Sequence, residues 1–279
     1  MTNLKTLDEH REYLYQIVKL QLFFLRNWLR EHPEETLPAA LRNRIDIYRK
    51  TSINKGLLNP EVTNFECPEW LELERRLELV YKQHKDNAAA FEEAAFAIFN
   101  NTIDERVEKD YKDESRLAGY QCGSLRYNEY EDGSKHEIVN FHIDNARQPE
   151  SMFADPQYLP RCFLELMRQT FEKYGLTRLY TNTWLNSLPR WLELFPQEWQ
   201  DNLSPENTDV QWHYGFWGQF ITSRGTFNYK YGEILRKTGK FPFYPRKSSC
   251  SFANMKKHLS DILQSKRIDN GSEVCEYWQ

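Results

Sequence analysis

The chain has no long hydrophobic run. Its most apolar early segment, QIVKLQLFFLRNWL at residues 16–29, contains Lys19 and Arg26. A helix that crosses a bilayer needs about 20 consecutive apolar residues. The sequence therefore predicts no membrane-spanning helix, and no signal peptide is recognised at its start.

Cysteine is sparse and does not occur in paired motifs. Cys67, Cys122, Cys162, Cys250 and Cys275 are scattered, there is no C-x-x-C pair, and the number is odd. A disulfide framework uses an even number of cysteines in an oxidising compartment. We therefore expect reduced thiols in a cytoplasmic protein.

The chain also lacks an excess of positive charge. Its formal net charge is −4, which argues against non-specific nucleic-acid binding as the main activity. The average hides a basic final quarter, because residues 223–267 hold eleven Lys and Arg against Glu233 and Asp261. This quarter could contact phosphates, an acidic partner, or the acidic stretch at residues 61–114 of the same chain.

Aromatic residues, by contrast, are abundant, with 8 Trp, 16 Tyr and 17 Phe. Several gather in short polar segments, where they could line a pocket for an aromatic or acyl substrate. The alternative is a core strand with a hydrogen-bonded histidine. The residues concerned are Trp184, Asn186, Trp212, His213, Tyr214, Phe216, Trp217 and Gln219.

Residues 1–115 are predicted to be helical. Apolar residues recur at helical spacing over residues 8–31, and again after Pro68. The alanine-rich stretch that begins at Asn87 favours another helix. No residue pattern in this region indicates catalysis, so we expect it to form a helical layer or cap.

Near residue 116 the hydrophobic period changes to alternation. Two alternating runs flank EDGS at residues 131–134, which predicts a β-hairpin. A loop at 145–157 and a periodic helix ending at Gly175 follow. A buried strand at about 176–185 is then expected to pack beside the strand that precedes the helix.

The remaining segments complete the prediction. DVQWHYGFWGQFITSRG at 209–225 is aromatic and interrupted by glycine, and it predicts a bent strand or a pair of strands. The tail predicts a helix, a proline-aromatic loop and a second helix. We therefore predict an α+β fold with a helical region at 1–115, a mixed-sheet core at 116–225 and a basic C-terminal extension at 226–279.

The segment FHIDNARQPESMFADPQYLPRCFLELMRQTFEKYGLTRLYTNTWLNSLPRWLELFP begins at residue 141 and has the order strand, loop, helix, glycine, strand, short helix. Over residues 135–200 this order resembles the central half of the GNAT acyltransferase superfamily, and TRLYTNTWLN (177–186) and WLELF (191–195) match best. The resemblance implies transfer of an acyl group from a thioester donor, such as an acyl-CoA, to a small amine.

The resemblance also implies where the donor binds. In such a site the loop and the helix N-terminus present backbone N–H groups to the pyrophosphate of coenzyme A, and two diverging strands leave a gap for the pantetheine arm. A base then deprotonates the amine and an acid protonates the thiolate. This chain departs from the pattern because residues 145–158 contain no glycine, and Trp191 and Leu192 stand where a tyrosine acid is common.

Candidate site residues follow from these placements. His142, Asp144 and His213 are the candidate catalytic residues, and either histidine could be the base. The candidate substrate-binding residues, with the two arginines as anion contacts, are Arg147, Trp184, Asn186, Trp217 and Arg224. The expected partner is a small molecule, and no oligomeric state is predicted.

Two other functions stay open. His142, Asp144 and His213, followed by Arg224, resemble the ligand order of iron/2-oxoglutarate dioxygenases, in which two histidines and a carboxylate bind iron(II) and an arginine binds the 2-oxoacid. Short motifs of this kind also occur by chance. Alternatively, the chain could be a binding protein without catalysis, whose acidic helices and basic tail dock partners.

Overall fold

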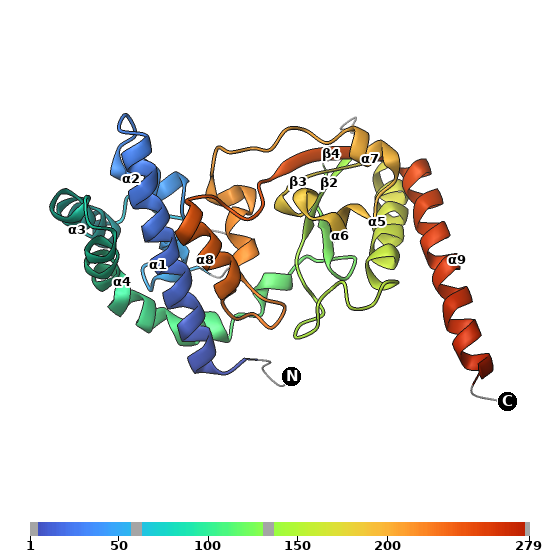
Figure 1. Cartoon of the computed structure of the whole chain (residues 1–279), viewed down its shortest axis with the longest axis horizontal. Helices are drawn as coiled ribbons and strands as arrows, with labels where there is room; N and C mark the ends of the chain where they lie inside the picture. The colour runs from blue at the N-terminus through green and yellow to red at the C-terminus, as the bar shows by residue number, and fades with distance from the viewer. Residues whose placement is uncertain (1–4, 57–62, 131–136, 277–279) are drawn as a thin grey trace. The chain divides into compact units, whose positions relative to one another are not determined.

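The computed structural model describes residues 5–56, 63–130 and 137–276. It confirms the predicted α+β class, because helices precede a mixed β-sheet and a long helix follows it (Figure 1). The chain forms two compact units, each made from two segments. The helical unit comprises residues 1–118 and 209–242, and the sheet unit comprises residues 119–208 and 243–279.

These units divide the chain differently from the predicted boundaries at 1–115, 116–225 and 226–279. Residues 209–242 belong with the N-terminal helices, and residues 243–279 belong with the sheet. The reason is that hydrophobic periodicity reports local conformation, and it does not report which distant segment a stretch packs against.

The first segment of the helical unit is built from helices, as predicted. Their bounds are α1 (Leu7–Glu31), α2 (Leu37–Asn43), α3 (Pro68–His84) and α4 (Ala88–Tyr111), with 3₁₀ turns η1 (Tyr48–Lys50) and η2 (Ser115–Leu117). A capping box begins α1: Thr6 Oγ1 accepts the Glu9 N–H at 3.1 Å, and the Glu9 carboxylate accepts the Thr6 N–H at 2.7 Å. Together these two bonds satisfy donors that a helix start leaves unpaired.

Residues 209–225 do not form the predicted pair of strands, so that prediction is wrong. They form the 3₁₀ helices η4 (Trp212–Tyr214) and η5 (Phe216–Phe220), joined by Gly215 in the left-handed region at φ 76°. A single β-bridge joins Ile221 to Phe227. The helix α8 (Tyr229–Thr238) follows.

The spacing of the buried aromatics explains this outcome. The rings of Phe216, Trp217 and Phe220 lie 5.3, 5.2 and 5.7 Å from the ring of Phe241. Residues separated by one and four positions share one side of a helix, whereas a strand would turn neighbouring residues to opposite faces. The aromatic content predicted burial, but its periodicity is helical.

The sheet unit contains a mixed sheet with the strand order β1-β2-β3-β4. The strands are β1 (Leu125–Tyr127), β2 (Ile138–Ile143), β3 (Arg178–Thr183) and β4 (Arg246–Ser251). β1 and β2 are antiparallel, β2 and β3 parallel, and β3 and β4 antiparallel. The predicted hairpin is confirmed, and so is the prediction that the strand after the helix packs beside the strand before it, while the EDGS turn lies outside the described residues.

Helices connect and follow these strands. Their bounds are α5 (Tyr158–Tyr174), η3 (Trp184–Ser187), α6 (Pro189–Leu192), α7 (Gln197–Asp201) and α9 (Phe252–Glu276). The helix α5 ends at Gly175, which has φ 69° and donates its N–H to Phe171 O at 2.8 Å. This left-handed C-terminal cap is the predicted stop.

The sequence prediction missed β4, which lies in the segment expected to be a proline-aromatic loop. Its sequence, RKSSCS, has no strongly β-forming run. It becomes a strand because all six residues, from Arg246 to Ser251, pair with β3. This pairing is tertiary information that a local pattern does not carry.

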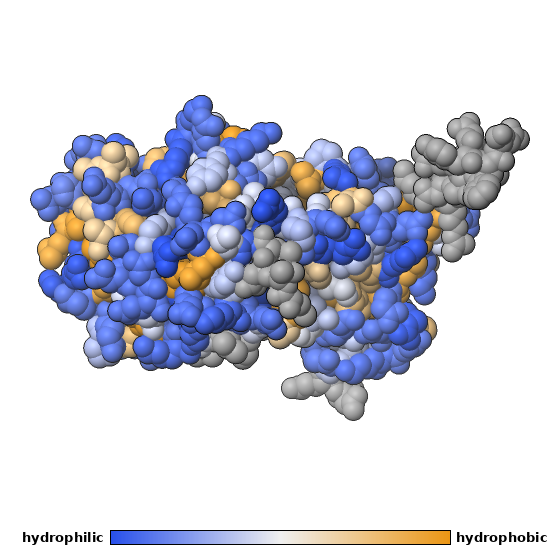
Figure 2. Space-filling model, turned by 90° about the horizontal axis from the view of Figure 1, so that it is seen from below, coloured by the Kyte–Doolittle hydropathy of each residue, from blue (hydrophilic) through white to orange (hydrophobic). Residues whose placement is uncertain are grey.

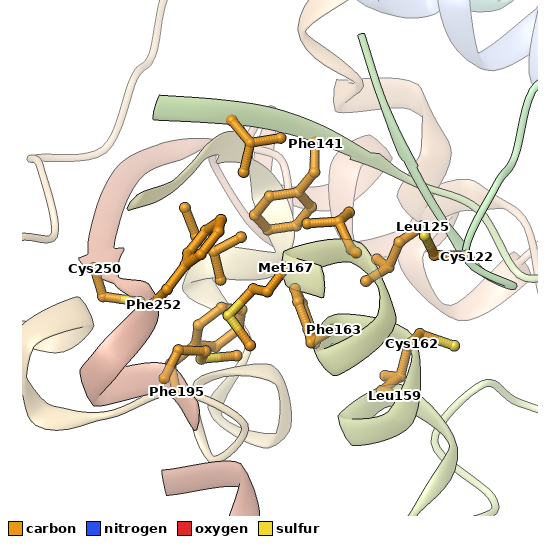
Figure 3. Packing of buried hydrophobic residues seen from close by; sticks show 14 of the residues in the cluster. Cys122, Leu125, Phe141, Leu159, Cys162, Phe163, Met167, Phe195, Cys250 and Phe252 are labelled. Atoms are coloured by element: carbon orange, nitrogen blue, oxygen red, sulfur yellow. The ribbon is translucent and has the colours of Figure 1, made fainter. Parts of the chain in front are cut away.

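One face of the sheet carries the core of this unit (Figure 3). Figure 3 shows Phe141 of β2, Phe163 and Met167 of α5, Phe195 and Phe252 directed into a common interior. The Phe141 and Phe163 rings meet edge to face at 5.3 Å. Burying aromatic side chains of this size is the main stabilising contribution to such a layer.

In Figure 2 hydrophilic residues cover most of the visible face, and apolar residues form small separate patches. Among the described helices none has the length and apolar character that a membrane span requires. This finding agrees with the sequence prediction.

Asn186 joins the second half of the sheet to the helices beside it. Its side chain is 0% exposed. Nδ2 donates to Arg246 O at 2.7 Å and to Thr181 O at 3.4 Å, while Oδ1 accepts the indole N–H groups of Trp191 at 2.9 Å and Trp199 at 3.2 Å. A buried amide with every group paired fixes its neighbours, and this one links β3, β4, α6 and α7.

We expect Asn186→Ala to lower the free energy of unfolding by about 3 kcal/mol, because it removes the partner of two buried indole donors and of two strand carbonyls. Urea denaturation followed by tryptophan fluorescence measures this change. The matched control is Asn202→Ala, which removes one exposed bond to Ser249 O and should cost below about 1 kcal/mol. Equal losses for the two variants would contradict the assigned role of Asn186.

Candidate active site

The parallel ladder between β2 and β3 is shorter than either strand. Residues 138–140 pair with residues 178–180, and there the ladder ends. Both strands continue for three residues, to Ile143 and Thr183. We call these two extensions, residues 141–143 and 181–183, the strand opening.

Contacts on both sides hold the strand opening in place. The end of β2 stays paired with β1 through Ile143 and Leu125, and the end of β3 stays paired with β4. At the end of the ladder Thr181 Oγ1 donates to Phe141 O at 3.1 Å. A side chain thus replaces the backbone bond that a continuing parallel ladder would make.

A polar set of side chains lies on the sheet face opposite the core. Neighbouring residues in a strand point to opposite faces. Because Leu125, Tyr127, Val139, Phe141 and Leu179 are buried in the core cluster, the residues between and beside them face away from it. We call this set the polar face: Arg126, Asn140, His142, Tyr180 and Asn182.

His142 stands on the polar face at the strand opening. Its Nε2 lies 2.9 Å from Asn128 Oδ1. Since an amide oxygen only accepts, Nε2 carries the proton and Nδ1 of the neutral ring is the basic nitrogen. Burial, and next the positive charge of Arg126, lower the pKa of His142 below its ordinary value of 6.5. The imidazole is therefore neutral at pH 7 and able to accept a proton.

Two atoms of the polar face make no hydrogen bond within the part of the chain that the structure describes. They are Arg126 Nε and Asn182 Oδ1, and both are shielded from solvent. A shielded polar atom without a partner costs about 1–3 kcal/mol, so such atoms indicate a place that a ligand or water completes. Beside the base, the face therefore offers one donor and one acceptor.

Asp144 and Arg147 lie in the loop that follows β2 and have structural partners. The Asp144 N–H donates to Ser124 O at 3.1 Å, and Asp144 Oδ1 accepts the Asn145 N–H at 2.7 Å. Arg147 Nη2 is paired with Glu150 at 3.0 Å. The hydrogen bond that Arg147 donates to Glu150 raises the pKa of Arg147 above its ordinary range. Asp144 shapes the start of the loop, and an anion would have to compete with Glu150 for Arg147.

The other candidate residues of the sheet unit serve its packing. The Trp184 ring stacks on the Phe243 ring at 6.0 Å. Asn186 is the buried link between strands and helices, and its amide is fully used there. Its bonds to Trp191 and Trp199 are structural, so a contact from Asn186 to substrate would break the core.

Three candidates lie in the helical unit, outside the polar face. Trp217 is buried and donates its indole N–H to Arg44 O at 3.0 Å, which is a structural contact. His213 and Arg224 are exposed on the same unit. No side-chain contact of the structure joins these three residues into one site.

The alternative function, an iron oxygenase, needs two histidines and a carboxylate close together. Among the described residues there is no group of three or more His, Cys, Asp or Glu side chains that could hold a metal ion. Nε2 of His142 is engaged by Asn128. His142 and Asp144 belong to the sheet unit, whereas His213 belongs to the helical unit.

The helical unit contains a cavity. A cavity of about 490 Å³ lies beside the turn at residues 52–56, and Tyr48, Thr102 and Glu105 are among its walls. Its size falls within the range of small-molecule pockets. However, its polar groups bond to one another, as where Ser52 Oγ donates to Glu105 at 2.6 Å. We therefore give more weight to the polar face, where shielded atoms have no such partners.

Sequence reasoning missed Arg126, Asn128 and Asn182. Arg126 is the cross-strand partner of His142, and the alternation of Leu125 and Tyr127 places it on the same face as that histidine. Asn182 is the polar residue between two threonines of β3. A signal for both was available in the alternation, but the pairing of Arg126 with His142 and the position of β3 beside β2 are tertiary contacts that a local pattern does not give.

We expect Arg126→Gln to raise the pKa of His142, because the variant removes the positive charge that disfavours imidazolium. Burial is the larger cause of the lowering, so the rise should stay below about one pH unit. An NMR titration of the imidazole measures it. Arg168→Gln, an exposed change on α5, is the control and should leave the titration unchanged. A fall, or no change, on Arg126→Gln would contradict the assigned geometry.

Compared with known proteins, the chain matches no family model, no curated protein and no solved structure.

Proposed function

We propose that the sheet unit transfers an acyl group from a thioester donor to a small amine, with His142 as the general base. The observation that carries this proposal is a neutral imidazole at the end of an interrupted parallel ladder. The strand–helix–strand order of β2, α5 and β3 also supports it, because that order underlies the resemblance to the GNAT superfamily.

The proposed reaction needs few groups. The amine nitrogen attacks the thioester carbonyl carbon, and His142 Nδ1 takes the proton that the nitrogen loses. As the carbon–sulfur bond breaks, its electron pair stays on sulfur, and the imidazolium returns the proton to the thiolate. The products are an amide and a thiol, and the base is regenerated.

The polar face supplies the remaining contacts. The Arg126 Nε–H is a donor available to the negative oxygen that develops on the carbonyl, and such a donor stabilises the tetrahedral intermediate. Asn182 Oδ1 is an acceptor available to an N–H of the attacking amine. These two shielded atoms suit a substrate that brings one acceptor and one donor.

The strand opening suits an extended donor. Backbone groups of residues 141–143 and 181–183 lie beyond the β2–β3 ladder. The two amides of a pantetheine arm can pair with strand edges as an added strand does. The donor would then place its thioester near His142, which belongs to the same extension.

We also propose a cytoplasmic location and small-molecule substrates for this reaction. Cys67, Cys122, Cys162 and Cys250 are free thiols, which suits the reducing cytoplasm and a thioester substrate. The substrates are small molecules, and the net charge of −4 gives no support to a nucleic-acid substrate.

We expect His142→Gln to lower kcat/KM for acyl transfer by about 10²–10⁴, the usual contribution of a general base. Acetyl and octanoyl thioesters, offered with a panel of small amines, are assayed by release of free thiol. His258→Gln is the control in the same unit, since His258 Nε2 hydrogen-bonds Glu193 O and does not belong to the polar face, and His213→Gln tests the other candidate base.

Loss of activity on His142→Gln with retention in both controls would support the proposal. Full activity of His142→Gln would contradict it. So would the absence of both thiol release and a thermal shift with every thioester.

A further inference from the structure

We infer that the donor is recognised through an acyl-pantetheine arm and not through a nucleotide pyrophosphate. This inference rests on the proposed function and concerns the loop between β2 and α5, residues 144–157, which we call the donor loop. The resemblance to the GNAT superfamily implies that this loop holds the pyrophosphate of coenzyme A. Its hydrogen bonds in this chain do not fit that group.

Most backbone N–H groups of the donor loop already donate hydrogen bonds within the protein. A pyrophosphate cradle needs several N–H groups that point to the ligand and have no other acceptor. Here the N–H groups of nine residues already donate to acceptors in the loop or in Ser124, at 2.7–3.2 Å. These residues are Asp144, Asn145, Ala146, Arg147, Glu150, Phe153, Ala154, Gln157 and Tyr158.

The N-terminus of α5 is closed in the same way. Asp155 Oδ1 accepts the Gln157 N–H at 2.8 Å, and Asp155 O accepts the Tyr158 N–H at 3.1 Å. Pro160 in the first turn has no N–H, and Leu159 is 2% exposed. The first turn therefore presents no cluster of donors to a phosphate.

The charged residues of the donor loop also disfavour a pyrophosphate. The donor loop contains Asp144, Glu150 and Asp155 against Arg147 alone, and that arginine is paired with Glu150. Asp155 already places a negative charge where the helix dipole favours one. A pyrophosphate brought to this end of α5 would meet the Asp155 carboxylate, and the N–H groups of Gln157 and Tyr158 there are already bonded. A pantetheine thioester has no such requirement, because its arm needs only amide partners at the strand opening.

The pantetheine arm has two sources, a small thioester or a carrier protein that bears phosphopantetheine. Both share the chemistry that the strand opening would recognise. Three donors with one octanoyl group separate them: octanoyl-pantetheine, octanoyl-CoA and an octanoyl carrier protein. We expect octanoyl-pantetheine and octanoyl-CoA to differ by no more than about threefold in Kd.

Saturation-transfer NMR on octanoyl-CoA with the full chain tests the inference directly. The pantetheine methyl protons should receive saturation, and the adenine protons should not. A kcat/KM for the carrier protein above that of octanoyl-pantetheine identifies the protein-borne source, while equality identifies the small thioester. Both results support the inference.

Saturated adenine protons, together with octanoyl-CoA binding more than about 30-fold tighter than octanoyl-pantetheine, would overturn the inference and leave the proposed function standing. If no donor receives saturation and none is turned over, the proposed function fails and the inference fails with it.

Asp155→Asn gives an independent readout. It keeps the oxygen that accepts the Gln157 N–H and removes the charge, so octanoyl-CoA should bind about two- to fivefold more tightly while octanoyl-pantetheine is unchanged. Glu172→Gln, at the other end of α5, is the control and should change neither. An unchanged or weaker affinity of Asp155→Asn for octanoyl-CoA would contradict the electrostatic part of the inference.

Discussion

The sheet unit depends on how β3 is held between two different neighbours. Asn186 donates to backbone carbonyls of both β3 and β4 and accepts two indole N–H groups, so β3 and β4 stay together with the helices beside them. On the other side β3 pairs with β2 over three residues only, and Thr181 then bonds Phe141 O with its side chain. The strand opening follows from this asymmetry, because each strand is kept by its outer partner.

This constraint also accounts for the chemistry that we assign. His142 lies at the opening because the β2 extension stays paired with β1, and that pairing brings Arg126 opposite His142. Burial, and next the charge of Arg126, lower the pKa of His142 and keep the imidazole neutral, which is the state that a general base needs. On the same face Arg126 Nε and Asn182 Oδ1 make no hydrogen bond with any residue that the structure describes. Most backbone N–H groups of the donor loop already donate within the protein, and we therefore propose the strand opening, and not the loop, as the place where a thioester donor binds.

The sequence predicts the local elements of this unit well and their assembly less well. The hairpin, the helix that stops at Gly175 and the parallel pairing follow from hydrophobic period and turn chemistry. The strand β4 was not predicted, because RKSSCS is a strand only through its pairing with β3. The aromatic segment after residue 209 was predicted as strand but forms 3₁₀ helices, whose aromatic side chains pack on one side. Of the candidate site, His142 and its place before a loop were found, whereas Arg126 and Asn182 require the register, and the structural roles of Asn186 and Trp217 require their partners.

The central claim is that a thioester donor binds at the strand opening beside His142. Backbone amide shifts of the labelled full chain during titration with octanoyl-pantetheine test it most directly. We expect the perturbed amides to lie in residues 141–143 and 181–183 and in their cross-strand partner Arg126. Perturbations confined to the cavity of the helical unit, around residues 52–56, or none at a saturating donor concentration, would contradict the account.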